Sequence, residues 1–472
     1  MLVETVEREL KLAAKAGFAW PAELRGEPLA PRRLESAYYD TSRRTLARAG
    51  ITLRRRVEDG NGVWQLKLPA GAARRELEVA GGKSLPPQLR ALLRAHLGGG
   101  PLEPVAELLT LRTGVRVREG ARAVADVVLD EVEAVANGSR STFRELEIEL
   151  VEGDERELFA IRDTLVRGGA RAASQRPKLF RVLGVEPWKP PRRSASAVEH
   201  LRAAVAKQVG ELLAHDPGLR LGGDAEQLHD FRVATRRLRA ILRVARRALG
   251  TERVVPLRGE LAWLGSALGP ARDLDVMLEH VDAEVESLPD ADREAGARLI
   301  AALAEGREPA RTAVARALNS KRYAALVAAL DELAHDEAPA LDDVSITALA
   351  RRELRQLTEA IEGLGPNPPD ETLHASRISA KRARYAVELV PGGGRRVVEL
   401  VDAVKDVQDV IGRHQDAAVL EERLRDLAEA QPAVALVAGI LVERQRERRR
   451  LARAALPAAW RGVERAQKKA WG

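Results

Sequence analysis

The spacing of apolar and polar residues changes once along the chain, near residue 190. Before residue 185, short runs alternate between apolar and polar positions and are separated by turn sequences such as Asn137-Gly138, a pattern that predicts β-strands and hairpins. From residue 196 to the end, apolar residues recur three and four positions apart, which predicts helices that bury one face. Residues 186–195, rich in proline and charge, predict a semi-rigid linker between these two parts.

In several predicted strands, charged residues alternate with apolar residues, so that one face of the strand is charged and the other is apolar. Residues two apart lie on the same side of a strand. If other elements cover the apolar face, the charged face must surround water, and closure into an antiparallel barrel would leave no free edges. We therefore predict a closed barrel with a charged lumen. The charged sets are Glu7, Glu9 and Lys11; Arg54 and Arg56; Arg74, Glu76 and Glu78; Arg112 and Arg116; and Glu145, Glu147 and Glu149.

These charges suggest phosphate chemistry. Glutamates at this spacing on two strands can bind Mg²⁺ or Mn²⁺, which prefer oxygen ligands and contact phosphates through their remaining positions. Basic side chains would then surround the phosphate oxygens. The alternative for any single strand is a solvated face with cross-strand ion pairs. The candidate basic residues are Lys11, Arg54, Arg56, Lys67, Arg74, Arg112 and Lys178.

In the helical part, residues 229–247 read HDFRVATRRLRAILRVARR. Basic residues at steps of three and four share one helix face, about 20 Å long, beside an apolar stripe that can be buried. Like charges at this spacing repel one another, so the row predicts a regular polyanion as partner. A solvated charged face is the alternative. The basic face comprises His229, Arg232, Arg236, Arg239 and Arg243, and Arg237 lies beside it.

The same pattern occurs a second time. Residues 374–389, HASRISAKRARYAVEL, repeat it at an offset of 374 − 229 = 145. Further along the chain, Gly412 corresponds to Gly269 at an offset of 412 − 269 = 143. Two separated signatures at nearly one offset predict a duplicated helical unit, with repeats over about residues 196–335 and 340–472. The basic residues of the second copy are His374, Arg377, Lys381, Arg382 and Arg384.

Composition narrows the function classes. The chain has 472 residues, a net charge of +7 and no cysteine, which excludes disulfides, thiolate metal sites and a cysteine nucleophile. Aromatic residues make up 3%, which disfavours a nucleic-acid partner that stacks bases on aromatic rings. No apolar run reaches the length of a membrane span, and the N-terminus lacks a signal-peptide core. We expect no membrane partner and a cytoplasmic protein.

Residues from about 195 to 470 resemble a CHAD domain through the two basic signatures and the elements that follow them. The resemblance implies a bundle of two related helical halves whose basic groove binds inorganic polyphosphate. The matched basic residues of both copies, from His229 to Arg243 and from His374 to Arg384, are the expected polyphosphate contacts.

The N-terminal part resembles the CYTH domain of the triphosphate tunnel metalloenzymes. Residues 7–11, ERELK, match its ExExK signature, and YYDT at 38–41, WQLK at 64–67 and the late glutamate strand continue the match to about residue 182. The resemblance implies an eight-stranded tunnel that hydrolyses triphosphates with Mg²⁺ or Mn²⁺. It implies metal ligation by Glu7, Glu9, Glu147 and Glu149, a catalytic set of Glu7, Glu9 and Lys11, and substrate contacts at Lys11, Arg54, Arg56, Lys67, Arg112 and Lys178, with Arg74 and Arg116 as further candidates.

Together these predictions describe an α+β multidomain protein: a tunnel domain over residues 1–185, a linker over 186–195 and an all-helical domain over 196–472. The expected function is metal-dependent hydrolysis of inorganic triphosphate or short polyphosphate, with polyphosphate held by the helical domain. A polyphosphate-binding protein with an inactive tunnel, and a nucleic-acid-binding protein, are the alternatives.

Overall fold

The computed structural model describes residues 2–70, 73–98, 100–186, 189–222, 225–335 and 344–471, except for the side chains of Glu7 and Ala70. The predicted linker therefore lies partly outside the described residues, at 187 and 188. The chain divides into two compact units. One, the sheet unit, comprises residues 1–189 and 216–221, and the other, the helical unit, comprises residues 190–215 and 222–472.

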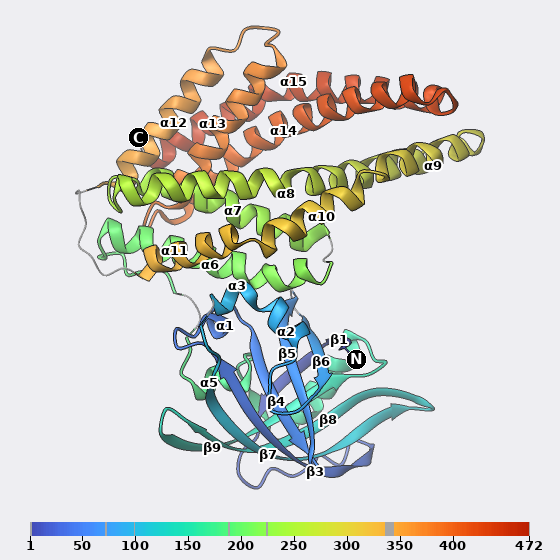
Figure 1. Cartoon of the computed structure of the whole chain (residues 1–472), viewed down its shortest axis with the longest axis vertical. Coiled ribbons are helices and arrows are strands. Elements are labelled where there is room, and N and C mark those ends of the chain that lie inside the picture. Colours follow the sequence, from blue (N-terminus) through green and yellow to red (C-terminus); the bar gives the residue numbers. More distant parts are fainter. Residues whose placement is uncertain are drawn as a thin grey trace. The chain divides into compact units, whose positions relative to one another are not determined.

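One antiparallel sheet forms most of the sheet unit (Figure 1), with strand order β1-β6-β5-β4-β3-β7-β8-β9-β2-β10. Short helices lie in the connections, and α4 begins at a capping box in which Asp154 and Glu157 satisfy each other's backbone amides. The strands are β1 Leu2–Glu7, β2 Glu9–Ala13, β3 Gly26–Asp40, β4 Thr52–Glu58, β5 Asn61–Ala70, β6 Ala73–Ala80, β7 Glu103–Glu119, β8 Arg122–Ala136, β9 Ser139–Leu150 and β10 Arg171–Ala172. The helices are α1 Thr45–Arg48, α2 Pro87–Leu92, α3 Arg94–Leu97, α4 Glu155–Arg167 and α5 Lys178–Val182.

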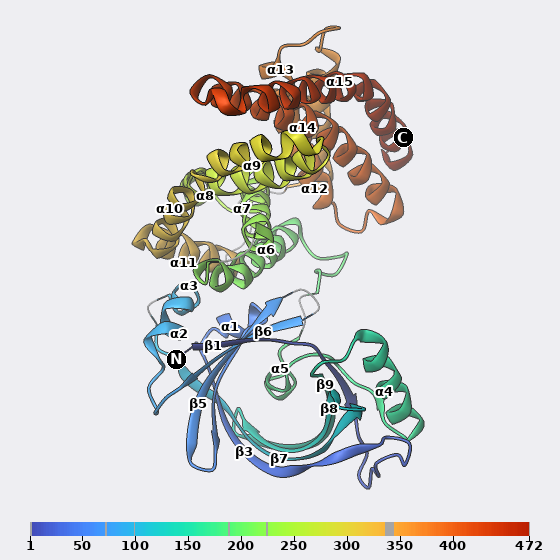
Figure 2. The same ribbon diagram turned by 90° about the vertical axis from the view of Figure 1, so that its right-hand side faces the viewer.

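The predicted eight-stranded count is wrong, and a closed barrel is not confirmed. The sheet has ten strands, and no pairing joins β1 to β10 among the described residues. The N-terminal run divides at Arg8 into two strands, of which β1 pairs with β6 and β2 pairs with β9. Because one residue separates β1 from β2, the chain itself brings the two ends of the sheet together. The sheet therefore curves strongly, as Figure 2 shows.

The two faces of this curved sheet differ as the alternation predicts. On the outer face, Leu146 and Ile148 of β9 are fully buried in a cluster that includes Leu158 and Leu165 of α4. On the inner face, α5 lies within the curve (Figure 2), and Leu179 of α5 belongs to a second apolar cluster. Burial on both faces holds α4 and α5 against the sheet, and α5 carries Lys178 at its first position.

The helical unit contains two pairs of packed helices, one within each predicted repeat. Helices α7 and α8 pack together, as do α13 and α14, and α7 also contacts α13. An apolar cluster joins α8 and α9 to α14 and α15, with Val281, Leu424 and Leu441 in it. No helix among the described residues is long and apolar enough to cross a membrane. The helices are α6 Ala197–Arg220, α7 Ala225–Ala245, α8 Thr251–Glu286, α9 Asp290–Ala304, α10 Arg307–Asn319, α11 Lys321–His335, α12 Ile346–Glu362, α13 Asp370–Glu388, α14 Gly394–Ala430 and α15 Ala435–Trp471.

The prediction of an antiparallel sheet unit followed by an all-helical unit is thus confirmed. Its physical basis is the change of period, from two in the first part of the chain to three and four in the second.

Candidate functional site

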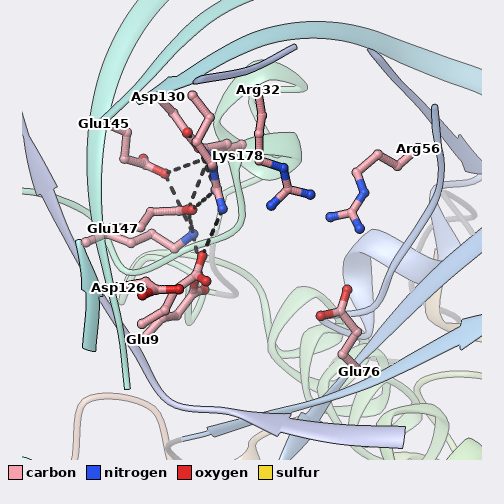
Figure 3. Close-up of polar contacts among 12 residues, drawn as sticks. Glu9, Arg32, Arg56, Glu76, Asp126, Asp130, Glu145, Glu147 and Lys178 are labelled. Carbon is pink, nitrogen blue, oxygen red and sulfur yellow. Dashed lines mark hydrogen bonds and ion pairs between the residues drawn. The ribbon is translucent and has the colours of Figure 1, made fainter. Parts of the chain in front are cut away.

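Charged residues from four strands and α5 meet on the inner face of the sheet (Figure 3). Antiparallel pairing sets Glu9 opposite Glu149 and Lys11 opposite Glu147. The neighbouring strands continue this face with Asp130, which pairs with Glu145 on one side and Arg112 on the other. Because side chains of directly paired residues lie on the same face, the register alone gathers these groups.

Glu147 lies at the centre of this cluster and is only 4% exposed. One of its oxygens is 2.8 Å from Lys11 Nζ and 3.1 Å from Lys178 Nζ, and the other is 2.6 Å from Arg112 Nη2. Burial opposes ionisation of this carboxyl, but the three cations outweigh it and hold the pKa of Glu147 well below its usual range. Glu147 is therefore a carboxylate at neutral pH.

Asp130 and Glu149 complete the partners of Arg112. Its guanidinium donates to both oxygens of the fully buried Asp130, at 2.7 and 2.8 Å, and lies 3.2 Å from Glu149. Lys178 also pairs with Asp130. These contacts fix Arg112 and Lys178 beside the carboxylates, because a buried ion pair is stable only when its remaining hydrogen-bonding capacity is satisfied.

Glu145 behaves differently from its neighbour. Its Oε1 lies 3.7 Å from Lys11 Nζ and 3.8 Å from Lys178 Nζ, too far for hydrogen bonds. Burial raises the pKa of Glu145 to about 7, against the pull of both lysines. The pKa values of these two carboxyls on one strand are thus shifted in opposite directions, and the negative charge of Glu147 itself helps to raise that of Glu145.

Three of the predicted metal ligands lie close together. Glu9, Glu147 and Glu149 each offer an oxygen, and these atoms lie within 4.8 Å of one another. A set of carboxylate oxygens of this kind fits a hard divalent cation such as Mg²⁺ or Mn²⁺. The fourth predicted ligand, Glu7, ends β1 opposite Arg74, but its side chain lies outside the described residues.

The predicted substrate contacts on β4 and β5 form a second charged group. Arg54 donates to Gln65 at 2.5 Å and to the Tyr38 hydroxyl at 3.1 Å. Arg56 lies 3.6 Å from Glu78, and Lys67 lies 3.6 Å from Glu76. In Figure 3, Arg56 lies opposite the cluster around Glu147, across the space that the curved sheet surrounds.

Arg32 shares this space, as Figure 3 shows, but the sequence analysis missed it. Its guanidinium forms a bidentate contact of 2.5 Å with Glu58, and it pairs with Arg112 across β3 and β7. The register shifts between Leu29 and Arg32, so simple alternation along β3 does not identify the inward face. The one sequence feature that could have pointed to Arg32 was its place in the adjacent basic pair Arg32 and Arg33.

Two further predicted substrate contacts have partners other than Glu147. Arg74 donates to the backbone carbonyls of Gly50 and Lys67, at 2.9 and 3.3 Å. Arg116 forms a bidentate contact of 2.7 Å with Asp126, four residues further along β7 than Arg112.

In the helical unit, the basic faces of α7 and α13 adjoin each other. Burial, followed by repulsion from Arg377 and Arg236, lowers the pKa of Lys381 to about 8. Burial and repulsion from Arg243 and Arg239 likewise lower the pKa of Arg382. Because each group is influenced by cations of the other helix, the two predicted stripes form one basic surface, which we call the α7–α13 groove.

Acidic residues and glycines hold one arginine of each copy in an equivalent way. Arg232 donates to the carbonyl of Leu268 at 3.1 Å and lies 3.3 Å from Asp273, while Arg377 lies 3.5 Å from Asp416. A side chain at Gly412 would come within 3.1 Å of Arg377. The duplicated signature thus includes the residues that position these arginines.

Other predicted groove residues vary in exposure. His229 and His374 are exposed rather than part of the core. The protein still removes part of the water around the His229 ring, and this partial desolvation, followed by repulsion from Arg272, lowers the pKa of His229. Arg384 is only 8% exposed, lies 3.2 Å from Glu388 and stacks on Tyr385. The structure therefore places Arg384 within the helix packing, because every residue of α13 from Ala383 to Val387 is buried.

Arg237 and Arg243 each have an acidic neighbour. Arg237 lies 3.6 Å from Glu388, and Arg243 lies 3.3 Å from Glu353. Both arginine side chains remain partly exposed, at 37% and 30%.

Comparison with known proteins identifies both units. The CYTH domain model matches residues 5–174, and the CHAD domain model matches residues 203–425. An uncharacterized protein of Mycobacterium tuberculosis (strain CDC 1551 / Oshkosh) is 31% identical over 489 aligned positions, which cover 95% of this chain and 93% of that protein. PptA from Streptomyces chartreusis is 25% identical, with a TM-score of 0.49 over 57% of this chain and 100% of that chain. The CHAD domain from the plant Ricinus communis is 25% identical, with a TM-score of 0.49 over 58% of this chain and 94% of that chain.

Proposed function

Because the chain belongs to the family of proteins that join a CYTH domain to a CHAD domain, we propose that it hydrolyses inorganic triphosphate or short polyphosphate in the sheet unit and binds inorganic polyphosphate in the α7–α13 groove. The hydrolysis would depend on Mg²⁺ or Mn²⁺. The observation that carries the first part is the convergence of Glu9, Glu147 and Glu149 within 4.8 Å.

The chain's own residues fit this chemistry. Glu9, Glu147 and Glu149 would hold the metal ion, which when bound polarises a phosphoryl oxygen and stabilises its developing charge. Lys11, Lys178 and Arg112 now contact the same carboxylates. When a triphosphate enters, these cations can turn toward its oxygens, while Arg32 contacts it from beside Arg112 and Arg56 contacts it from the opposite part of the curved sheet (Figure 3).

The first experiment measures phosphate release by the full chain with Mg²⁺ or Mn²⁺, using triphosphate, long polyphosphate and ATP as separate substrates. We expect release from triphosphate that a chelator and Glu9→Gln abolish. The matched control is Glu133→Gln, an exposed glutamate of β8. If no substrate releases phosphate while polyphosphate still binds, the protein is a polyphosphate-binding protein with an inactive tunnel.

The observation that carries the second part is the contact between α7 and α13, which sets Lys381 and Arg382 beside cations of α7. A row of like charges is stabilised by an anion that contacts all of them, and a polyphosphate chain presents such charges regularly. Competition at equal phosphate concentration separates this ligand from nucleic acid, since a basic groove can contact any phosphate backbone. If duplex DNA displaces polyphosphate, the ligand assignment is wrong.

A further inference from the structure

A cavity of about 760 Å³ lies at the C-terminal end of α7, between that helix, α8 and α12. Its basic lining comes from all three helices and from the residues directly after α7. Glu353 is the one carboxylate among the described residues that line it. The guanidinium groups belong to Arg243, Arg246, Arg247, Arg258, Arg352 and Arg355.

These positive charges are poorly compensated within the described part of the unit. Glu353 lies 3.3 Å from Arg243 and is its acidic neighbour. Arg258 Nε is buried and has no hydrogen-bond partner among the described residues. Burial, followed by repulsion from Arg243 and Arg239, lowers the pKa of Arg258. A buried polar group without a partner is costly, so these two observations indicate an anionic ligand.

The cavity continues the α7–α13 groove rather than standing apart from it. Arg243 belongs to the α7 stripe and also lines the cavity. The positive charge of Arg243 helps to lower the pKa of Arg382 in α13. The charge of Arg382 in turn helps to lower the pKa of Arg258. A polyanion that follows the groove toward the C-terminal end of α7 therefore reaches the cavity.

We infer that the cavity binds the terminal phosphoryl group of the polyphosphate chain whose interior lies in the α7–α13 groove, an inference that rests on the proposed function of that groove. Along the groove, basic residues come from two helices, whereas guanidiniums from three elements converge on the cavity.

A chain terminus differs from the interior in charge and in available oxygens. An interior phosphate carries one negative charge, whereas a terminal phosphomonoester-like group approaches two at pH 7, because its second pKa is about 6. It also presents three peripheral oxygens, which suit several guanidinium forks at once. The densest positive charge of the groove thus matches the densest negative charge of the ligand.

The experiment compares two polyphosphates of one length, with free ends and with both ends capped as alkyl phosphoramidates, which removes the second terminal charge. Binding to the full chain is measured at pH 7. The variant is Arg352→Gln/Arg355→Gln, because both side chains are exposed and their loss should not affect folding. The matched control is Arg293→Gln/Arg298→Gln, two exposed arginines of α9 that pair with Asp290 and Glu294.

We expect the unaltered protein to bind free-ended chains about tenfold more tightly than capped ones, the size of one charge-assisted contact. Arg352→Gln/Arg355→Gln should lose that preference, weakening binding of free-ended chains while leaving capped chains nearly unchanged. The control variant should keep the preference.

The failures of the two proposals can be told apart. If the unaltered protein binds neither polyphosphate, the proposed function of the groove is wrong. If it binds both equally and the cavity variant changes nothing, the groove binds polyphosphate but the cavity does not hold its terminus. If the cavity variant weakens both ligands equally, the cavity binds chain interior, which also overturns the terminal assignment.

Discussion

Both units of this protein gather basic side chains, but they neutralise them in opposite ways. In the sheet unit, Lys11, Lys178 and Arg112 contact carboxylates at hydrogen-bonding distance. In the helical unit, burial and then repulsion from neighbouring arginines lower the pKa values of Lys381 and Arg382. The cluster around Glu147 is thus internally compensated, whereas the α7–α13 groove gathers cations that repel one another.

This difference indicates what each unit requires from a ligand. A metal ion in the sheet unit must compete with ammonium and guanidinium groups for the same carboxylates, so selectivity depends on how those cations rearrange. A polyanion on the helical unit relieves repulsion already present, so binding should also stabilise the fold. Four further experiments test this contrast, beginning with the largest expected effect.

Replacing Glu147 with glutamine should affect the sheet unit most. It removes a predicted metal ligand and leaves three cations without their shared partner. We expect phosphate release from triphosphate to fall by at least about 100-fold and the free energy of unfolding by about 3 kcal/mol. Phosphate assays and urea unfolding measure the two effects. Glu133→Gln should change neither, and an unchanged stability for Glu147→Gln would contradict internal compensation.

Reversing two groove charges should affect only the helical unit. We expect Arg236→Glu/Arg239→Glu to weaken long-polyphosphate binding by roughly 100-fold, at about 1.5 kcal/mol for each lost charge-assisted contact. Triphosphate hydrolysis should be unchanged. Arg293→Glu/Arg298→Glu on α9 makes the same change of charge and serves as the control. Equal loss of binding and hydrolysis would mean that the two units do not act separately.

The pH dependence of binding tests the repulsion among the groove cations more finely. The pKa of Lys381 in the free protein is about 8, and a bound polyanion would raise it by favouring the charged form. Between pH 7 and 8, where the chain ends keep their charge, affinity should therefore change little, and it should fall as the pH rises above 8, by up to about tenfold per pH unit for one proton. Lys381→Arg, which stays charged, should remove this dependence. A pH-independent affinity for the unaltered protein would contradict the assignment.

The smallest effect concerns the glycines beside the positioned arginines. A side chain at Gly269 would lie 3.7 Å from Arg232, an ordinary contact, whereas one at Gly412 would lie 3.1 Å from Arg377. Gly269→Ala should thus stabilise the helical unit by about 0.5–1 kcal/mol through helix propensity. Gly412→Ala should stabilise the helical unit less than Gly269→Ala does, and it should weaken polyphosphate binding slightly. Thermal unfolding and binding titrations distinguish the two, and equal behaviour would show that Arg377 moves without cost.

Much of the fold could be predicted because its signals are local. The change from alternating to helical spacing near residue 190 predicted a sheet followed by helices, while the duplicated unit inferred from the offset between His229 and His374 stays a prediction. The strand count could not be predicted, because Arg8 divides one continuous charged run into two strands that pair with different partners.

The candidate site was predicted unevenly for a similar reason. Glu9, Lys11, Glu147 and Glu149 lie where alternation along regular strands implies, so the sequence identified the members that the structure brings together. Arg32 follows a register shift, and Arg384 lies in a buried stretch of α13. Neither fact is encoded in the spacing of neighbours along the chain.

By itself, the sequence determined which residue types recur at which spacing, and so the two families, the charged strand face and the duplicated basic helices. The tertiary structure alone decided which charges meet. Packing set Lys178, from the last part of the sheet unit, against Glu147, and it brought Arg258, Arg352 and the end of α7 around one cavity. Periodicity specifies the face of an element, whereas the distance between two faces depends on how distant elements pack.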